Sequence, residues 1–182
     1  IFPIFSGTNT QGSNDIGCNP RFLPGYAPID SADARVRFAQ AWNHDIPAET
    51  GLGAVEMFEA MRGGLVKAAV VAGDGLSPSA EGLGDVPAAL SKLEFLVITD
   101  IFESELTHKA DVLLPSTTSI EVDGTYTNLE RRVQLLSAGL ELRNEERPGW
   151  ATFALLAQNL GAAGFEYASA TEIFEEITEL VN

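Results

Sequence analysis

The stretch that decides the fold runs from residue 95 to residue 115 and reads FLVITDIFESELTHKADVLLP. It contains two short apolar runs, 95–99 and 112–114, which are separated by the polar segment 104–109. An acidic residue or a proline follows each run, a pattern that is typical of buried parallel strands. The polar segment is long enough for one or two helical turns. This order predicts an open α/β sheet, in which ligands bind at the carboxyl edge of the strands.

A third apolar run, residues 66–72, is interrupted only by Lys67. We expect the three runs to lie side by side as parallel strands, joined by right-handed crossovers, with helices on both faces of the sheet. An antiparallel pairing of any two of them would contradict this interpretation. The predicted fold class is therefore α/β, with an open, mostly parallel, Rossmann-like sheet.

Cap residues and apolar spacing predict helices in the rest of the chain. Ser31 and Asp85 are suitable N-caps, and Ser169 with Glu172 forms a capping-box pattern. The expected helices cover about 31–42, 54–63, 85–93, 150–160 and 169–180. Residues 125–127 and 132–136 are β-like and predict a small strand excursion from the main sheet. Two helices should then close the chain at its carboxyl end.

Length and charge limit the classes of function. At 182 residues with 45% hydrophobic content, the chain is expected to form a single α/β domain spanning 1–182. A formal charge of −15 argues against nucleic acid and anionic lipid as partners. No apolar run approaches the ~20 residues of a membrane span, so no direct membrane insertion is expected. Because Ile1 opens inside an apolar segment, we interpret the chain as a fragment of a longer subunit.

Residues suited to direct catalysis are not grouped in this chain. Cys18 is the single cysteine, which excludes an internal disulfide and a cluster ligated by cysteines of this chain alone. The two histidines, His44 and His108, lack metal-ligand spacing. A Gly-x-Gly pattern begins at Gly73, but Pro78 stands at its third glycine position. We therefore assign no catalytic residue and no metal ligand.

One candidate ligand loop, residues 6–17, follows the apolar run at the amino end. Its glycines and small polar residues allow the backbone to approach a ligand closely. Asn9, Gln11 and Gly12 are the candidate binding residues in this loop. Composition alone favours an ordinary surface loop.

The second candidate site lies at the carboxyl ends of two predicted strands. Gly73, Asp74 and Ser77 follow the 66–72 run, and Asp100 follows the 95–99 run. Glycines at this edge expose backbone amides to a diphosphate or nucleoside. The carboxylate of Asp100 could bind ribose hydroxyls or a guanine edge, or it could only cap a turn. The residues alone leave these two roles equal.

In this order and spacing the segments resemble the molybdopterin oxidoreductase family. The family pattern Gly-x-Asn-x-Gln-Gly-x-x-Asp-x-Gly-x-x-Pro matches residues 7–20, and Leu-Pro-Gly-Tyr follows at 23–26. A second family pattern is Asp-x-Phe-x-Thr-Glu-Thr-Ala-x-x-Ala-Asp-Val-Val-Leu-Pro. Residues 100–115 fall on it without a gap at Asp100, Phe102, Glu105, Ala110, Asp111, Val112, Leu114 and Pro115, with Ser104 in place of the first threonine. A third, Asp-Gly-Thr-x-x-Asn-x-Glu-x-Arg-Val-Gln, matches residues 123–134.

The resemblance implies that both candidate sites contact a molybdopterin guanine dinucleotide. In the family, the two strand ends contact the guanosine part. This sequence departs from the family's Gly-x-Asn-Pro loop, because Gly75 and Leu76 replace the asparagine and proline. We therefore expect no cofactor to be bound by this fragment alone. Guanosine nucleotides should bind it weakly, with a Kd of roughly 1 mM or more.

Two branches of the family remain open. The first loop is similar to that of the large peripheral subunit of the respiratory NADH-quinone oxidoreductase (complex I), which is the favoured interpretation. That branch implies a scaffold domain, iron–sulfur clusters elsewhere in the full-length subunit, and a cytoplasmic location peripheral to the inner membrane. Its partners would be the remainder of its own subunit and other subunits of a respiratory complex.

The alternative branch is the formate dehydrogenase alpha subunit, which residues 130–134 (ERRVQ) resemble more closely. It implies a domain that forms one wall of an active molybdenum or tungsten cofactor site. In either branch, this fragment alone is not expected to be catalytic. A free-standing nucleotide-binding module is a third hypothesis, supported only by the loop at Gly73 and by Asp100.

Overall fold

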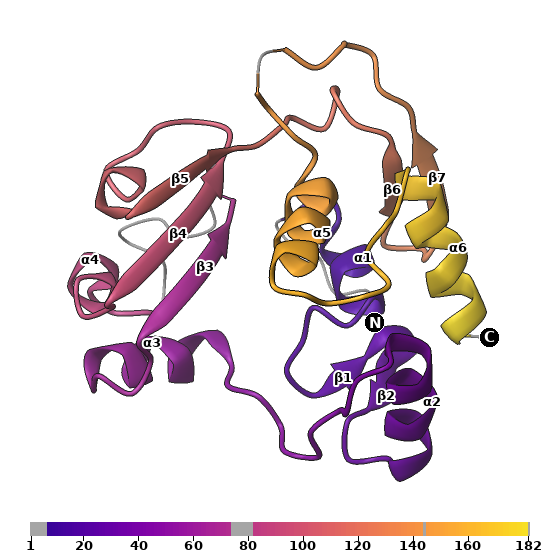
Figure 1. The fold of residues 1–182 in the computed structure, drawn as a ribbon, viewed down its shortest axis with the longest axis horizontal. Helices are drawn as coiled ribbons and strands as arrows, with labels where there is room; N and C mark the ends of the chain where they lie inside the picture. Colours follow the sequence, from indigo (N-terminus) through magenta and orange to yellow (C-terminus); the bar gives the residue numbers. More distant parts are fainter. Residues whose placement is uncertain (1–6, 74–81, 144, 182) are drawn as a thin grey trace. The chain divides into compact units, whose positions relative to one another are not determined.

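The computed structural model describes residues 7–73, 82–143 and 145–181 (Figure 1). The chain divides into two compact units. The sheet unit comprises Leu52–Glu121 and Leu140–Thr152, and the discontinuous unit comprises Ile1–Gly51, Val122–Gly139 and Phe153–Asn182. That residues 1–182 form one domain stays a prediction. No helix among the described residues is long and apolar enough to cross a membrane.

The sheet unit contains the predicted parallel sheet. Its strands are β3 (Ala68–Ala72), β4 (Phe95–Asp100) and β5 (Val112–Pro115), in the order β3-β4-β5. Both pairs are parallel, so the α/β fold class and the predicted side-by-side parallel order of the three runs are confirmed. The register pairs Ala72 with Thr99 and Asp100 with Pro115, which places the carboxyl ends of all three strands at one edge.

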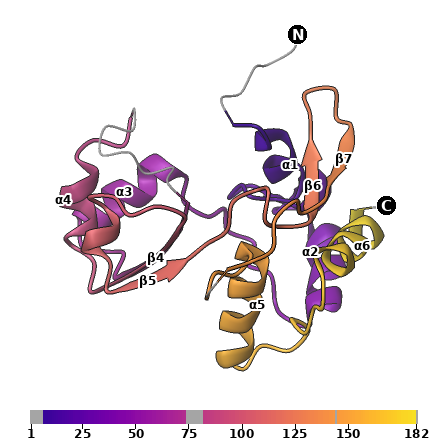
Figure 2. The same ribbon diagram turned by 90° about the horizontal axis from the view of Figure 1, so that it is seen from above.

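The core of the sheet unit lies between the sheet and two helices, α3 (Ala54–Arg62) and α4 (Val86–Leu90). Figure 2 shows both helices beside the sheet. Because paired residues of parallel strands share a face, the alternate residues of β3 and β4 point into one core. The buried members are Phe58, Met61, Leu83, Val86, Ala89, Leu90, Leu96, Ile98 and Leu106. The connection to β5 is a single turn, η2 (Thr107–Lys109).

The helix ends follow the predicted caps. The Asp85 carboxylate accepts a hydrogen bond from the Ala88 amide at 2.9 Å. Ser31 caps α2 (Ala32–Trp42) by accepting from the Ala34 amide at 3.4 Å. The Glu172 amide donates to the Ser169 hydroxyl at the start of α6 (Ala170–Val181). α5 (Gly149–Asn159) also lies where its sequence signals placed it.

The discontinuous unit is assembled from segments distant in the sequence. Its first segment forms α1 (Thr10–Asp15), β1 (Phe22–Leu23), η1 (Pro24–Tyr26), β2 (Ala27–Pro28) and α2. The predicted strand excursion is an antiparallel pair, β6 (Gly124–Thr127) and β7 (Val133–Leu136). A small core of Leu23, Ala34 and Phe38 packs with partly buried Ala27, Ile46 and Leu180.

The prediction of an irregular loop over 6–17 is wrong for residues 10–15, which form α1. Glycine and small polar residues have low helix propensity, so local composition hides this helix. A side-chain hydrogen bond from Gln11 Nε2 to Asp15 Oδ1, at 2.8 Å and four residues apart, supports the turn. The same bond belongs to a larger polar cluster.

Candidate functional site

Gly73 and Asp100 lie at the ends of the neighbouring strands β3 and β4, as the sequence predicts. The Gly73 amide donates to the Thr99 carbonyl at 2.8 Å, which extends the β3–β4 ladder by one bond. Gly73 has a φ of +82°, which favours glycine. Apart from its chain neighbours, no described atom lies within 4 Å of the position that its Cβ would take.

The carboxylate of Asp100 closes the turn after β4. Its Oδ1 accepts from the Ile101 amide at 2.7 Å, and its backbone carbonyl accepts from the Ser116 amide at 2.9 Å. Asp100 therefore caps the turn after β4, which is one of the two roles that the sequence left open. Its Oδ2 makes no hydrogen bond within the described part of the chain. One carboxylate oxygen thus remains free to accept a hydrogen bond from a ligand.

Thr99, next to Asp100, carries a buried hydroxyl that sequence reasoning missed. Thr99 is 3% exposed, and its Oγ1 has no hydrogen-bond partner among residues 7–73, 82–143 and 145–181. A buried hydroxyl without a partner costs about 1–3 kcal/mol. A threonine in an apolar strand gives no signal of this in the sequence. Because this hydroxyl is buried and the side chains of Thr99 and Asp100 point to opposite faces of the sheet, the strand end offers a ligand only the Asp100 oxygen that has no partner among the described residues.

Asp74 and Ser77, which the sequence also assigned to this edge, lie outside the described residues. Their role stays a prediction. The first ligand loop belongs to the discontinuous unit, whereas Gly73 and Asp100 belong to the sheet unit. That the loop lies near the strand ends therefore also stays a prediction.

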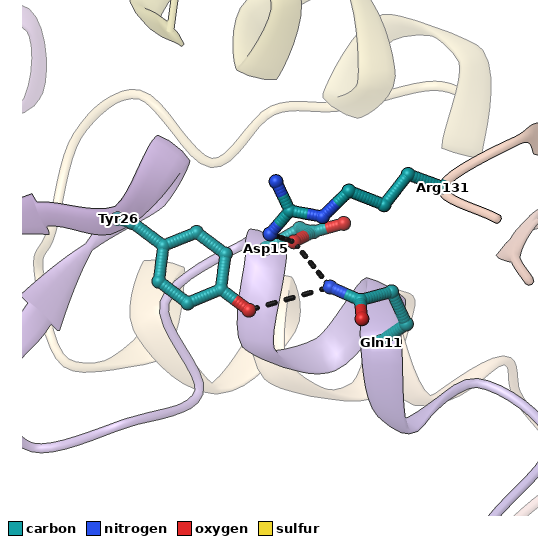
Figure 3. Close-up of polar contacts among 4 residues, drawn as sticks. All are labelled: Gln11, Asp15, Tyr26 and Arg131. Atoms are coloured by element: carbon teal, nitrogen blue, oxygen red, sulfur yellow. Dashed lines mark hydrogen bonds and ion pairs between the residues drawn. The ribbon is translucent and has the colours of Figure 1, made fainter. Parts of the chain in front are cut away.

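A polar cluster surrounds Gln11 in the discontinuous unit (Figure 3). The Gln11 Nε2 atom donates to Asp15 Oδ1 at 2.8 Å and to the Tyr26 hydroxyl at 3.3 Å. Arg131 Nη2 pairs with the same Asp15 oxygen at 3.3 Å. The Arg131 guanidinium also lies 5.2 Å from the centre of the Tyr26 ring. Four side chains from three separate segments thus contact one another.

Asn9 and Gly12 fix the first loop onto the strand pair. Asn9 Oδ1 accepts from the Thr127 amide at 2.9 Å, and its Nδ2 donates to the Thr125 carbonyl at 3.5 Å. A Cβ at Gly12 would collide with Asn9 Oδ1, so a larger residue there would displace the Asn9 side chain. Asn9 was predicted as a ligand contact. Its side-chain oxygen and nitrogen are both hydrogen-bonded to the backbone of β6. Its role toward a cofactor stays a prediction.

Two of the three non-glycine residues with positive φ among the described residues meet in the Gln11 cluster. They are Tyr26 at 57° and Arg131 at 61°. Such conformations cost free energy and are concentrated at functional sites, where the surrounding contacts hold them. Sequence reasoning missed Asp15, Tyr26 and Arg131 as site residues. The available signal was their position within or beside the family patterns quoted above.

No group of three or more histidine, cysteine or acidic side chains within the described residues could hold a metal ion. Both sites can offer hydrogen bonds to a ligand: the strand edge supplies an acceptor at Asp100, and the first loop supplies the amide of Gln11.

Comparisons with known proteins identify the family. The family model described as molybdopterin oxidoreductase matches residues 4–159. The chain is 37% identical over 179 residues to a Bacillus subtilis protein named "Putative formate dehydrogenase YrhE". It is 36% identical to "Probable oxidoreductase YjgC" of the same organism and 32% identical to "Putative formate dehydrogenase SH0748" of Staphylococcus haemolyticus. Each match covers 98% of this chain but only 18% of the relative.

Proposed function

Because the chain belongs to the molybdopterin oxidoreductase family, we propose that it is a dinucleotide-holding domain of a larger oxidoreductase of the formate dehydrogenase type. The names of the relatives support this type. The observation that carries the proposal is the strand edge, where Gly73 follows β3 and Asp100 ends the neighbouring strand β4 with one oxygen that has no partner among the described residues. Parallel α/β sheets bind nucleotides at this edge.

A molybdopterin guanine dinucleotide fits the groups at this edge. Ribose hydroxyls and the N–H groups of guanine are donors, and Asp100 Oδ2 is an acceptor without a partner within the described residues. Gly73 would allow close approach of the nucleoside. As a separate proposal, Gln11 of the first loop would contact a cofactor. When bound, the cofactor would supply the metal centre for substrate oxidation. The residues of this chain would bind and orient it.

We propose the remaining parts of the function on the same basis. Since the chain spans 18% of the relatives' length, other segments of the same polypeptide would supply substrate contacts and iron–sulfur clusters. The remainder of the subunit and other subunits of an electron-transfer complex would be its partners.

The competing proposal is a scaffold domain in the large peripheral subunit of NADH-quinone oxidoreductase, on the cytoplasmic side of the inner membrane. A sequence observation favours it: Gly75 and Leu76 replace the asparagine and proline of the family loop. Loss of that side-chain amide removes one guanine contact. In this proposal the domain holds neither molybdenum nor tungsten.

Metal analysis of the complete protein tests the two proposals. The formate dehydrogenase type predicts about one molybdenum or tungsten per chain, together with a pterin released on denaturation. Absence of both from protein produced in a molybdate- and tungstate-replete host that loads a known molybdoenzyme would favour the scaffold.

Asp100→Asn tests the strand edge. It keeps an oxygen for the Ile101 amide but replaces the second oxygen with a donor. We expect lower metal and pterin content with an unchanged thermal midpoint. Asp123→Asn is the matched control, because that carboxylate accepts from the Ala138 amide elsewhere. Equal retention in both variants would argue against cofactor binding by Asp100.

A further inference from the structure

The amide of Gln11 can adopt only one orientation in its cluster. An ionised carboxylate has no hydrogen to donate, so the Gln11 NH₂ group must face Asp15. The same nitrogen donates its second hydrogen to the Tyr26 hydroxyl. Both donors of the amide are therefore in use. The carbonyl oxygen Oε1 has no hydrogen-bond partner within the described residues, and Figure 3 shows it pointing away from Asp15 and Tyr26.

Arg131 contacts both hydrogen-bond partners of Gln11. It pairs with Asp15 at 3.3 Å and lies over the Tyr26 ring at 5.2 Å. A guanidinium can do both, because it is planar and carries several N–H donors, whereas an ammonium is a point charge. The cost of the left-handed backbone at Arg131, with φ at 61°, indicates that this placement is held by its contacts.

We propose that Arg131 is a positioning residue, which acts through Asp15 and Tyr26 to hold the Gln11 carbonyl outward as an acceptor. This inference rests on the proposed function and specifies the ligand chemistry at the first loop. Gln11 accepts a hydrogen bond from an N–H or O–H group, as on the edge of a pterin or guanine ring. It does not bind a phosphate, whose oxygens are acceptors and would face another acceptor.

The cluster is coupled, so removing Arg131 has a defined consequence. Without the guanidinium, the Asp15 carboxylate loses its ion pair, and the Tyr26 ring loses the cation above it. Asp15 and Tyr26 are then held less firmly, so the Gln11 amide that is bonded to both of them shifts with them, and its Oε1 no longer stays in place to accept from the ligand. If Arg131 is a positioning residue, its removal weakens cofactor binding only through Gln11. A general effect on folding would weaken binding whether or not Gln11 is present.

A double-mutant cycle in the complete, cofactor-loaded protein tests this coupling. The variants are Arg131→Met, Gln11→Ala and the pair together. The measurement is the rate of pterin release, followed by fluorescence after oxidation, with the thermal midpoint recorded for each variant. Each single variant should release pterin about tenfold faster, the effect of losing one hydrogen bond of about 1.4 kcal/mol. The double variant should release it no faster than Gln11→Ala alone, because Arg131 then has nothing to position.

Two further variants keep the test decisive. Arg131→Lys should release pterin more slowly than Arg131→Met but faster than the wild type, because the substitution keeps the positive charge but not the planar contact with Tyr26. Arg132→Met is the matched control, since Arg132 forms its hydrogen bonds to Asn128 through its backbone. It should release pterin at the wild-type rate.

Three outcomes would overturn the inference. The first is an additive, roughly hundredfold effect in the double variant, which would show that Arg131 acts independently of Gln11. The second is faster release by Arg132→Met equal to that of Arg131→Met, which would indicate a general effect of charge. These two leave the proposed function intact. Absence of pterin from the loaded wild-type preparation would overturn the proposed function and this inference together.

Discussion

The two compact units of this chain differ in how their parts are joined. The sheet unit comes mostly from one continuous stretch, Leu52–Glu121, and its described residues include nine buried apolar residues in one core. The discontinuous unit joins three stretches; among its described residues the core has three buried apolar residues, against which Leu180 of the last stretch packs. Its stretches are also joined by hydrogen bonds between residues 116, 118 and 134 positions apart. Among the described residues, apolar burial is therefore more extensive in the first unit, whereas polar contacts between distant segments contribute more to the second.

The largest expected effect comes from a cavity in the sheet unit. Phe58 is 4% exposed within the core cluster. Phe58→Ala should lower the free energy of unfolding of this unit by about 3–5 kcal/mol. Hydrogen exchange of the β4 amides would measure the change. Val70→Ala is a control, because Val70 is 50% exposed and its truncation should cost less than about 1 kcal/mol. A smaller loss for Phe58→Ala would show that its burial does not stabilise the unit.

The corresponding substitution in the discontinuous unit introduces a steric clash that breaks a hydrogen bond. Gly12→Ala places a Cβ against Asn9 Oδ1 and displaces it from the Thr127 amide. We expect a loss of about 1–3 kcal/mol, with faster hydrogen exchange at the Thr127 amide. Gly124→Ala, in the same unit, should not be destabilising, because nothing lies near its Cβ position and its φ is not in the left-handed region. Unchanged exchange at Thr127 would contradict the role of Asn9.

Each unit has a helix with a side-chain N-cap, and removing either cap should lower the stability of its helix by a smaller amount. The two losses can be compared directly. Asp85→Ala should destabilise α4 by about 1 kcal/mol, the usual cost of losing an N-cap. Ser31→Ala should cost α2 less, because its bond to the Ala34 amide is 3.4 Å long rather than 2.9 Å. Exchange of the first-turn amides in each helix measures both. A greater cost at Ser31 would reverse this ranking.

Alkaline pH should weaken the discontinuous unit selectively. Burial, together with the hydrogen bond to Glu176, raises the pKa of Tyr167 to about 12. A raised pKa gives stability that is complete below the ordinary value of about 10 and is lost as pH rises through 12. Because Tyr167 is partly exposed, screening limits this to about 1 kcal/mol. Tyr167→Phe should flatten the decline in unfolding free energy over this range, and an unchanged decline would exclude Tyr167 as its cause.

Acid pH provides the corresponding test in the sheet unit. Hydrogen bonds from the Thr118 amide and hydroxyl, each 2.7 Å, lower the pKa of Glu121. A lowered pKa gives stability that is present above the ordinary value and is lost as pH falls through the lowered one. Glu121→Gln should reduce this acid dependence slightly. Exchange of the Thr118 amide, measured against pH, would detect it, and an identical profile in the variant would contradict it.

The parts predicted correctly are those that depend on neighbours in the sequence. Apolar runs of strand length and N-cap residues such as Asp85 act within a few positions, so their outcome can be read locally. The same holds for Gly73 and Asp100, because the ends of parallel strands must share an edge. The helix at residues 10–15 was missed because its support includes a side-chain bond that propensity does not report.

The sequence by itself determined the α/β class, the parallel sheet and the strand edge, because short-range periodicity fixes which segments are strands. Only the tertiary structure decided which side chains surround Gln11. Asp15 and Arg131 are 116 positions apart, and no local pattern specifies that they pair. The Thr99 hydroxyl, which has no hydrogen-bond partner among the described residues, could also be identified only from its burial in the folded chain. Burial and long-range pairing are properties of the folded chain, and they assign the polar groups that a ligand can still use.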